Sequence, residues 1–201
     1  TGSVRTGKII QQEAAKRLIP TTLELGGKDP MIVFADAHLE RAAKGAVWGA
    51  LTNSGQVCMS VERIYVEKPV YERFIHLLRQ EVEALSQEMD AETTDLGSMT
   101  FPRQLDIVRD QVAEALSGGA RLVCGLPPEQ WKKGKGLHVQ PMILTDLSPE
   151  MKIMREETFG PVLCVLPFER EEEVIHLAND SPYGLNASVW SRDLAKARRV
   201  A

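Results

Sequence analysis

Asn53-Ser54-Gly55-Gln56-Val57-Cys58-Met59-Ser60 is the stretch around which the rest of the sequence is arranged. It places a single cysteine just after a glycine turn, between an amphipathic segment and a strand-like run. Such a turn can present the Cys58 thiol to a cleft and point nearby backbone N–H groups at the same substrate atom, as acyl chemistry requires. Free cysteines are more often small buried hydrophobes, so the octapeptide alone leaves both interpretations open.

The flanking segments predict alternating helices and strands. Apolar residues at helical spacing predict a helix over 39–51 that Asp36 can cap, and residues 61–67 read as a strand with Tyr65 opposite Ile64 and Val66. Upstream, residues 31–34 form a short apolar strand. Downstream we expect helices at 69–87, 105–116, 171–178 and from 194 onward, strands at 121–124, 162–166 and 187–190, and an exposed loop or hairpin at 126–137.

The first 25 residues combine small residues with a helical pattern. Gly2, Ser3 and Gly7 precede an apolar stripe that starts at Ile9, and Pro20 is expected to end the helix. Free N–H groups at a helix start can receive a phosphate, whereas the plainer interpretation is an N-cap by Ser3 or Thr6. Residues 21–25 then read as an extended run that carries Glu24 to Gly26-Gly27.

Composition excludes several classes of protein. The 201 residues are 43% hydrophobic and 26% charged, with a net charge of −4, which favours neither nucleic acid nor an anionic membrane as a partner. No apolar run approaches the roughly 20 residues that span a bilayer. The three cysteines are widely spaced, which argues against a disulfide framework and a metal site, and indicates a reducing cytoplasm. Cys124 and Cys164 lie in predicted strands and read as core residues.

Three motifs together identify a family. Leu23-Glu24-Leu25-Gly26-Gly27-Lys28, Gly55-Gln56-Val57-Cys58 and Glu156-Glu157-Thr158-Phe159-Gly160-Pro161 follow one another in the order and near the spacing of the aldehyde dehydrogenase superfamily, which the chain resembles along nearly its whole length. Thr1-Gly2-Ser3 with Gly7, and Tyr183-Gly184-Leu185, add weaker support.

The resemblance implies roles for particular residues. Cys58 resembles the nucleophile that attacks an aldehyde to give a thiohemiacetal and then a thioester, and Glu24 resembles the base that activates the hydrolytic water, a task that suits a carboxyl whose pKa burial has raised. Glu157 and Phe159 resemble the residues that hold the nicotinamide ribose and ring of NAD or NADP. Among the other cofactor-binding positions, Gly2 and Ser3 would lie by the pyrophosphate and the Leu25 backbone by the carboxamide, with Gly7 in the same group.

The same resemblance implies an α/β fold in which helices flank a largely parallel sheet. Residues 1–27 are expected to be the C-terminal remnant of a dinucleotide-binding domain, and 28–201 a catalytic domain truncated at its C-terminus. The implied function is oxidation of a small-molecule aldehyde to a carboxylic acid by a homo-oligomer. A coenzyme-A-acylating relative and an inactive or oligomerising remnant stay open as alternatives, although Glu24 counts against the first. The aldehyde, the choice between NAD and NADP, and dimer against tetramer are open at this stage.

Overall fold

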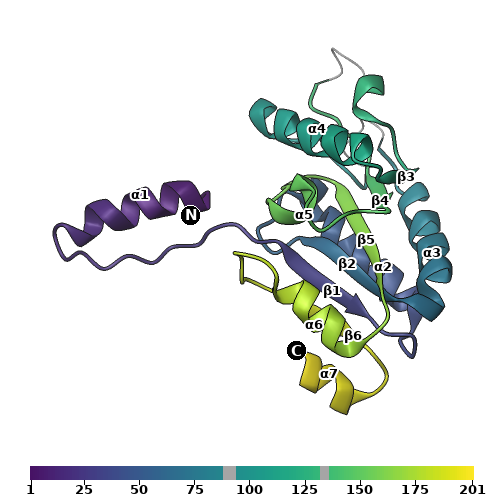
Figure 1. The fold of residues 1–201 in the computed structure, drawn as a ribbon. Helices are drawn as coiled ribbons and strands as arrows, with labels where there is room; N and C mark the ends of the chain where they lie inside the picture. Colours follow the sequence, from purple (N-terminus) through teal and green to yellow (C-terminus); the bar gives the residue numbers. More distant parts are fainter. Residues whose placement is uncertain (88–93, 132–135) are drawn as a thin grey trace.

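The computed structural model describes residues 1–87, 94–131 and 136–201. A six-stranded sheet forms its centre, with the strand order β3-β4-β5-β2-β1-β6 (Figure 1). Every neighbouring pair is parallel except β3 and β4. The strands are β1 (Asp29–Val33), β2 (Val61–Glu67), β3 (Arg121–Cys124), β4 (Met142–Thr145), β5 (Val162–Phe168) and β6 (Ser188–Trp190). The expected α/β fold with a largely parallel sheet is confirmed.

Helices cover both faces of this sheet. Alternate residues of β1 and β2 point to opposite sides: Ile64 and Val66 pack with α2 (Leu39–Leu51) and α3 (Tyr71–Glu83), while Tyr65 packs on the other face. That second face carries α4 (Pro102–Ser117), α5 (Lys152–Arg155) and α6 (Glu171–Asn179). Because both faces are buried, the middle of β2, Ile64 to Val66, is apolar on both sides, as strands of parallel sheets generally are. Helix α7 (Leu194–Val200) follows β6.

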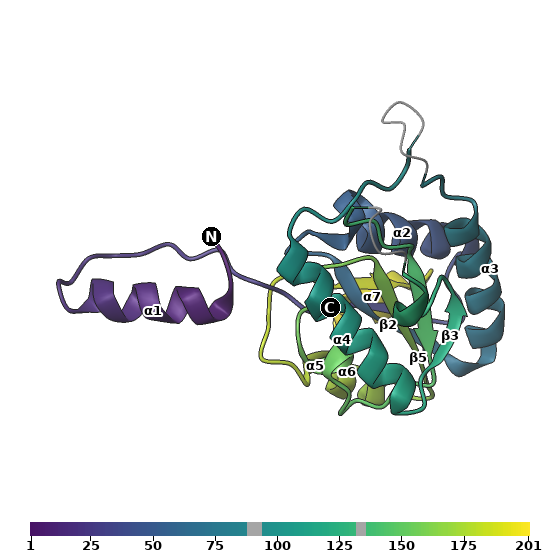
Figure 2. The ribbon, with the colours of Figure 1, turned by 90° about the horizontal axis from the view of Figure 1, so that it is seen from above.

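The N-terminal arm, residues 1–25, extends away from the sheet and its helices (Figures 1 and 2). It consists of α1 (Val4–Ala15) and an extended return segment, and its two ends meet where the Gly2 N–H donates to the Glu24 carbonyl at 3.1 Å. Apolar side chains of the arm face solvent, with Ile9 56% and Leu18 92% exposed. The arm therefore has an apolar surface that the described residues leave uncovered.

Several local predictions were wrong. Helix α1 starts at Val4, capped by Ser3, and ends at Ala15, five residues before Pro20, where the prediction placed its end. Helix α2 is capped by the His38 imidazole, because the Asp36 carboxylate instead accepts hydrogen bonds from Ser191 and the residues after it. Helix α3 stops at Glu83 rather than near residue 87.

Two short elements were not predicted. Strand β4 and helix α5 are each four residues long. The segment 126–137 includes the 3-10 turn Pro128–Gln130 and lies between the antiparallel strands β3 and β4. Residues 132–135 of this predicted loop lie outside the described part. Cys164 is buried as expected, and Cys124 is half-buried at the sheet edge, packed against the core. Among the described residues, no helix combines the length and the apolar character needed to cross a membrane.

Candidate active site

The turn that carries Cys58 has an unusual backbone. After α2, Asn53, Ser54 and Gly55 take φ angles of 52°, 58° and 73° in succession, all in the left-handed region. The amides of Asn53 and Gln56 stabilise this turn, because each side chain donates to the other residue's backbone carbonyl, at 3.1 and 3.0 Å. The chain then turns into β2 and leaves the Cys58 side chain exposed. The thiol is thereby presented at the surface and is not a small buried hydrophobe.

The three motif segments meet around this turn. A Cβ added at Gly27 would lie less than 3 Å from the Cys58 carbonyl oxygen, and one added at Gly55 equally close to the Gly160 carbonyl oxygen. The Gly27 N–H donates to Glu157 Oε1 at 3.1 Å, which joins the first motif to the third. The absence of side chains at these two glycines is thus what allows the segments to pack together.

A cavity of about 250 Å³ lies where the segments meet. It contains six of the eight residues that the sequence singles out: Gly2, Ser3, Leu25, Cys58, Glu157 and Phe159. Thr1, Gly26 and Gln104 complete the lining. Gln104 comes from α4, and its amide donates to the Thr158 carbonyl at 2.7 Å; its sequence context offered no signal for this role.

The other two predicted residues do not line the cavity. The Glu24 side chain is exposed on the arm, so the described residues do not bury it. Gly7 is buried in α1, where an added Cβ would lie 2.7 Å from the Leu25 side chain. The absence of a side chain at Gly7 therefore lets α1 pack closely against Leu25, which lines the cavity.

The half-buried carboxyl group of Glu157 has a shifted pKa. Burial raises its pKa above the ordinary value for glutamate, and the hydrogen bond from the Gly27 N–H opposes that shift. Glu62 raises this pKa further and Lys28 lowers it. Glu157 thus offers the cavity an acceptor carboxylate whose orientation is set by a backbone N–H group.

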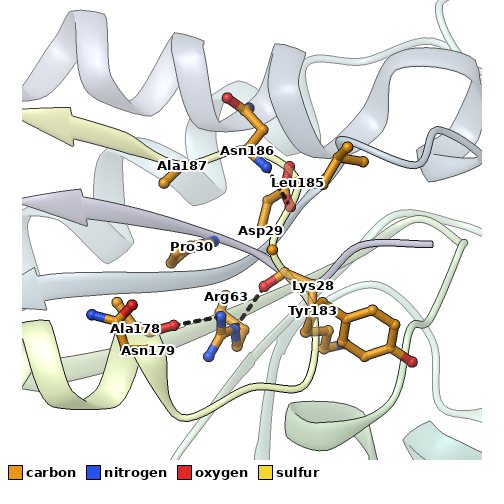
Figure 3. A pocket seen from close by; sticks show the side chains of 11 residues that line it. Lys28, Asp29, Pro30, Arg63, Ala178, Asn179, Tyr183, Leu185, Asn186 and Ala187 are labelled. Carbon is orange, nitrogen blue, oxygen red and sulfur yellow. Dashed lines mark hydrogen bonds between the residues drawn. The ribbon is translucent and has the colours of Figure 1, made fainter. Parts of the chain in front are cut away.

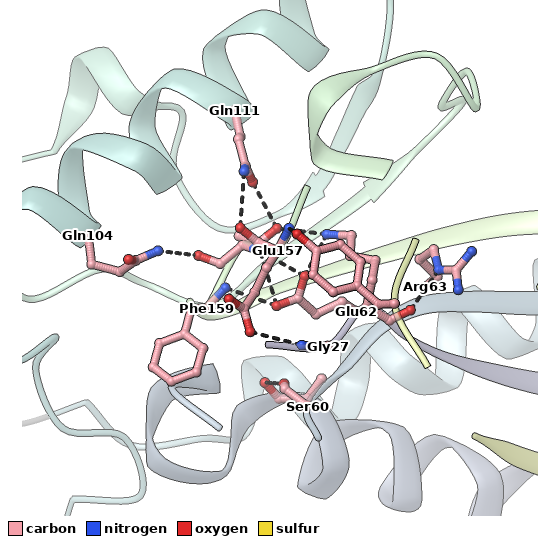
Figure 4. Close-up of polar contacts among 12 residues, drawn as sticks. Gly27, Ser60, Glu62, Arg63, Gln104, Gln111, Glu157 and Phe159 are labelled. Atoms are coloured by element: carbon pink, nitrogen blue, oxygen red, sulfur yellow. Dashed lines mark hydrogen bonds and ion pairs between the residues drawn. The ribbon is translucent and has the colours of Figure 1, made fainter. Parts of the chain in front are cut away.

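Behind the cavity lies a buried polar network that the sequence analysis missed (Figure 4). Lys28 and Glu62 are 1% and 3% exposed and form an ion pair at 2.5 Å. The Lys28 ammonium also donates to the Thr158 hydroxyl at 3.0 Å, and that hydroxyl donates to Gln111 at 2.8 Å. The third motif is therefore attached to β1, β2 and α4 through buried side chains.

Arg63, the residue after Glu62, connects this region to α6. Its guanidinium donates to the carbonyls of Lys28, at 2.8 Å, and Ala178, at 2.9 Å (Figure 3). A cation that hydrogen-bonds the last carbonyls of a helix also interacts favourably with the helix dipole. Arg63 thus secures the start of β1 and the end of α6 together.

A second cavity, of about 280 Å³, adjoins Arg63 and Asp29 (Figure 3). Asp29 Oδ1 accepts the Asn186 N–H at 3.2 Å, while its buried Oδ2 has no hydrogen-bond partner among the described residues. Burial raises the pKa of Asp29 to about 6, whereas the hydrogen bond from the Asn186 N–H lowers this pKa. No group of three or more potential metal ligands occurs within residues 1–87, 94–131 and 136–201.

Comparisons with known proteins agree with the motifs. The chain is 48% identical to 4,4'-diapolycopene aldehyde oxidase of Methylomonas sp and 43% identical to betaine aldehyde dehydrogenase 1 of Rhizobium meliloti (strain 1021), in each case over the whole of this chain. It superposes on the crystal structure of an NAD-dependent aldehyde dehydrogenase from Sinorhizobium meliloti with a TM-score of 0.94 and 36% identity, over 99% of this chain.

The matched regions are only part of these relatives. The chain spans 37% and 42% of the two curated proteins and 39% of the solved one. Within this chain, however, the profile of the aldehyde dehydrogenase family matches from residue 1 to residue 201. The three motifs, the sheet that brings them together and the match over the full sequence lead to one conclusion: the chain belongs to the aldehyde dehydrogenase family.

Proposed function

We propose that these 201 residues carry the nucleophile, the base and part of the cofactor site of an NAD(P)-dependent enzyme that oxidises an aldehyde to a carboxylic acid. One observation carries the proposal: an exposed cysteine thiol shares a cavity of about 250 Å³ with a half-buried carboxylate and an aromatic side chain. A thiol nucleophile beside groups able to hold a flat, hydroxyl-bearing cofactor is what this oxidation requires.

The cavity residues fit a nicotinamide nucleotide. The Glu157 carboxylate can accept hydrogen bonds from ribose hydroxyls, and the Phe159 side chain offers an aromatic surface to a flat ring. Gly26 leaves room for this carboxylate, because an added Cβ would lie 2.5 Å from Glu157 Oε2. Gly2 and Ser3 offer small residues for the pyrophosphate, with Leu25 and its support Gly7 nearby. When bound, NAD or NADP supplies the acceptor for the hydride that leaves the aldehyde carbon.

The chain's own residues carry the remaining steps. Cys58 Sγ, as a thiolate, attacks the carbonyl carbon, so that a C–S bond forms and the carbonyl π electrons move to oxygen, giving a thiohemiacetal. Departure of the hydride re-forms the C=O bond and leaves a thioester. Water then attacks the thioester carbon while Glu24 takes its proton, and the C–S bond breaks to release the acid and the Cys58 thiolate. Glu24 directly precedes Leu25 of the cavity wall, which supports its place at the rim of this site.

Replacement of the nucleophile tests the proposal in the complete gene product that contains these residues. Cys58→Ala should lower aldehyde-dependent reduction of NAD⁺ or NADP⁺ by at least about a thousandfold, since removing a covalent nucleophile has effects of that size or larger. Cys124→Ala is the matched control, because this half-buried thiol lies at the sheet edge and outside the cavity. Retention of activity by Cys58→Ala would refute the assignment.

A second variant separates hydrolysis from acyl transfer to coenzyme A. Glu24→Gln should permit a single burst of cofactor reduction, about one equivalent per active site, followed by slow release of acid. An enzyme that passes the acyl group to a second thiol would instead keep its steady-state rate when coenzyme A is present. The glutamate at position 24 favours hydrolysis over that alternative.

The proposal also covers the substrate class, the oligomeric state and the cellular compartment. The names of the relatives point to aldehydes as different as betaine aldehyde and 4,4'-diapolycopene aldehyde, so we propose a small-molecule aldehyde without naming it. We also propose a homo-oligomer located in the cytoplasm, where reducing conditions keep the Cys58 thiol available for attack.

A further inference from the structure

The Glu62 carboxylate is the acceptor on which the third motif depends. Glu62 lies in β2, four residues after Cys58, and is 3% exposed. Its two oxygens accept the N–H groups of Thr158, at 2.8 and 3.1 Å, and of Phe159, at 2.9 Å. Two consecutive backbone amides directed at one buried carboxylate fix both the position and the direction of the segment that carries Glu157 and Phe159.

The charge of this carboxylate is balanced by Lys28, which belongs to the first motif. Their 2.5 Å ion pair is almost entirely removed from solvent. With two amide donors and an ammonium group directed at it, position 62 requires several acceptor sites, which a carboxylate has and a glutamine amide does not. Glu62 therefore connects all three motifs. It lies in β2, which follows the Cys58 turn, its carboxylate pairs with Lys28 of the first motif, and it accepts the backbone N–H groups of the third motif.

The backbone at Phe159 shows why such an anchor is needed. Phe159 has a φ of 50°, which lies in the left-handed region and is energetically costly for a bulky residue. A residue in that region keeps its conformation only where surrounding contacts impose it. The hydrogen bond from the Phe159 N–H to Glu62 is one such contact, and it acts on the residue whose side chain lines the cavity.

We propose that Glu62 is a positioning residue that aligns Glu157 and Phe159 for the nicotinamide half of the cofactor while leaving the Cys58 turn unaffected. This inference rests on the proposed function. It separates two parts of one site, because the Cys58 turn is stabilised by its own amide contacts with Asn53, Gln56 and Thr100. Loss of the Glu62 carboxylate should therefore impair cofactor binding and hydride transfer more than thiol reactivity.

The test uses the complete gene product and the variant Glu62→Gln. We expect the KM for NAD⁺ or NADP⁺ to rise roughly tenfold or more, since one charge-assisted hydrogen bond changes an equilibrium constant by about that factor. The KM for the aldehyde and the alkylation rate of Cys58 should change less than about twofold. Independently of activity, hydrogen exchange at the Thr158 and Phe159 amides should accelerate roughly tenfold, as expected when a buried acceptor is lost.

Two further variants distinguish positioning from loss of stability. The double variant Glu62→Gln/Lys28→Met removes both buried charges, so it should recover most of the unfolding temperature while the raised cofactor KM persists. Val82→Ala, a buried α3 residue on the other face of the sheet, should lower stability without changing the cofactor KM.

The proposal is overturned if the double variant shows an unchanged cofactor KM, or if exchange at the Thr158 and Phe159 amides stays at the unmodified rate. Failure of the proposed function looks different: Cys58→Ala would remain active, whereas the amide-exchange result would still report on the anchoring by Glu62.

Discussion

Replacing Gly55 with alanine should destabilise the protein by two separate effects. Gly55 has a φ of 73°, and a residue with a Cβ costs roughly 1–2 kcal/mol in that conformation. The added Cβ would also lie less than 3 Å from the Gly160 carbonyl oxygen and 3.0 Å from that of Ala50. Overpacking of this kind typically costs about 1–3 kcal/mol, so we expect a total loss of about 2–5 kcal/mol in the free energy of unfolding.

Gly136→Ala isolates the steric part of that loss. Gly136 has a similar φ of 68°, but among the described residues the nearest atom to an added Cβ, in His138, lies 3.9 Å away. Urea unfolding of both variants should therefore show Gly55→Ala less stable than Gly136→Ala by about 1–3 kcal/mol. The Gly55 variant should also alter the alkylation rate of Cys58, three residues later, because the turn must shift. Equal losses in the two variants would refute the reasoning that Gly55 is required for close packing against the third motif.

Three further predictions concern buried charge and thiols. The pKa of Asp29 is about 6 in the folded protein and near 3.8 in the unfolded chain, so the free energy of unfolding should fall by about 1–3 kcal/mol as pH rises through this window. Urea midpoints measured across the same pH range should fall less in Asp29→Asn. Lys28→Met should cost about 3–5 kcal/mol in thermal unfolding because it leaves a buried carboxylate unpaired, whereas Lys68→Met, which breaks an exposed pair, should change little. Alkylation of the native chain, followed by mass spectrometry, should label exposed Cys58 first and Cys164 only on unfolding, since burial raises the pKa of the latter to about 12.

Each of these has a clear contrary result. A stability that falls between pH 4 and pH 6 to the same extent in Asp29→Asn and the unmodified chain would show that Asp29 is not the group responsible. Equal losses in the two lysine variants would mean that the Lys28 pair is not effectively buried. Labelling of Cys164 at the rate of Cys58 in the native chain would contradict the packing of β5.

Strand β2 was predicted from residues that pack on opposite faces of the sheet. In β2, Ile64 and Val66 on one side and Tyr65 on the other appear in the sequence as an unbroken apolar run, and the structure confirms their opposite directions. Strand β4, between Pro141 and Asp146, was not predicted, although it is as long as the predicted strand β3. Strand order lay beyond local patterns, because β5 pairs with β2 across about a hundred residues of sequence.

The buried ion pair was missed for a related reason. Charged residues in a sequence are ordinarily read as solvated, and Lys28 and Glu62 are 34 positions apart. They become partners only through the parallel register in which Asp29 pairs with Val61 and Pro30 with Arg63. A prediction of that register would have placed a lysine beside a glutamate at the start of two buried strands, where neither charge could remain without the other.

The parallel sheet itself explains where the site lies. Gly27 lies two residues before β1, Cys58 three before β2 and Gly160 two before β5, and these three strands are adjacent and parallel. Segments that enter neighbouring parallel strands meet at one edge of the sheet, so the thiol and the third motif have positions set by the core. Glu24 has no such constraint, because it lies on the arm, several residues before β1, and its side chain is exposed. The proposed base shares with the cavity residues Gly2, Ser3 and Leu25 a place on the arm, where the sheet does not determine its position, so its orientation depends on how the arm containing α1 is held.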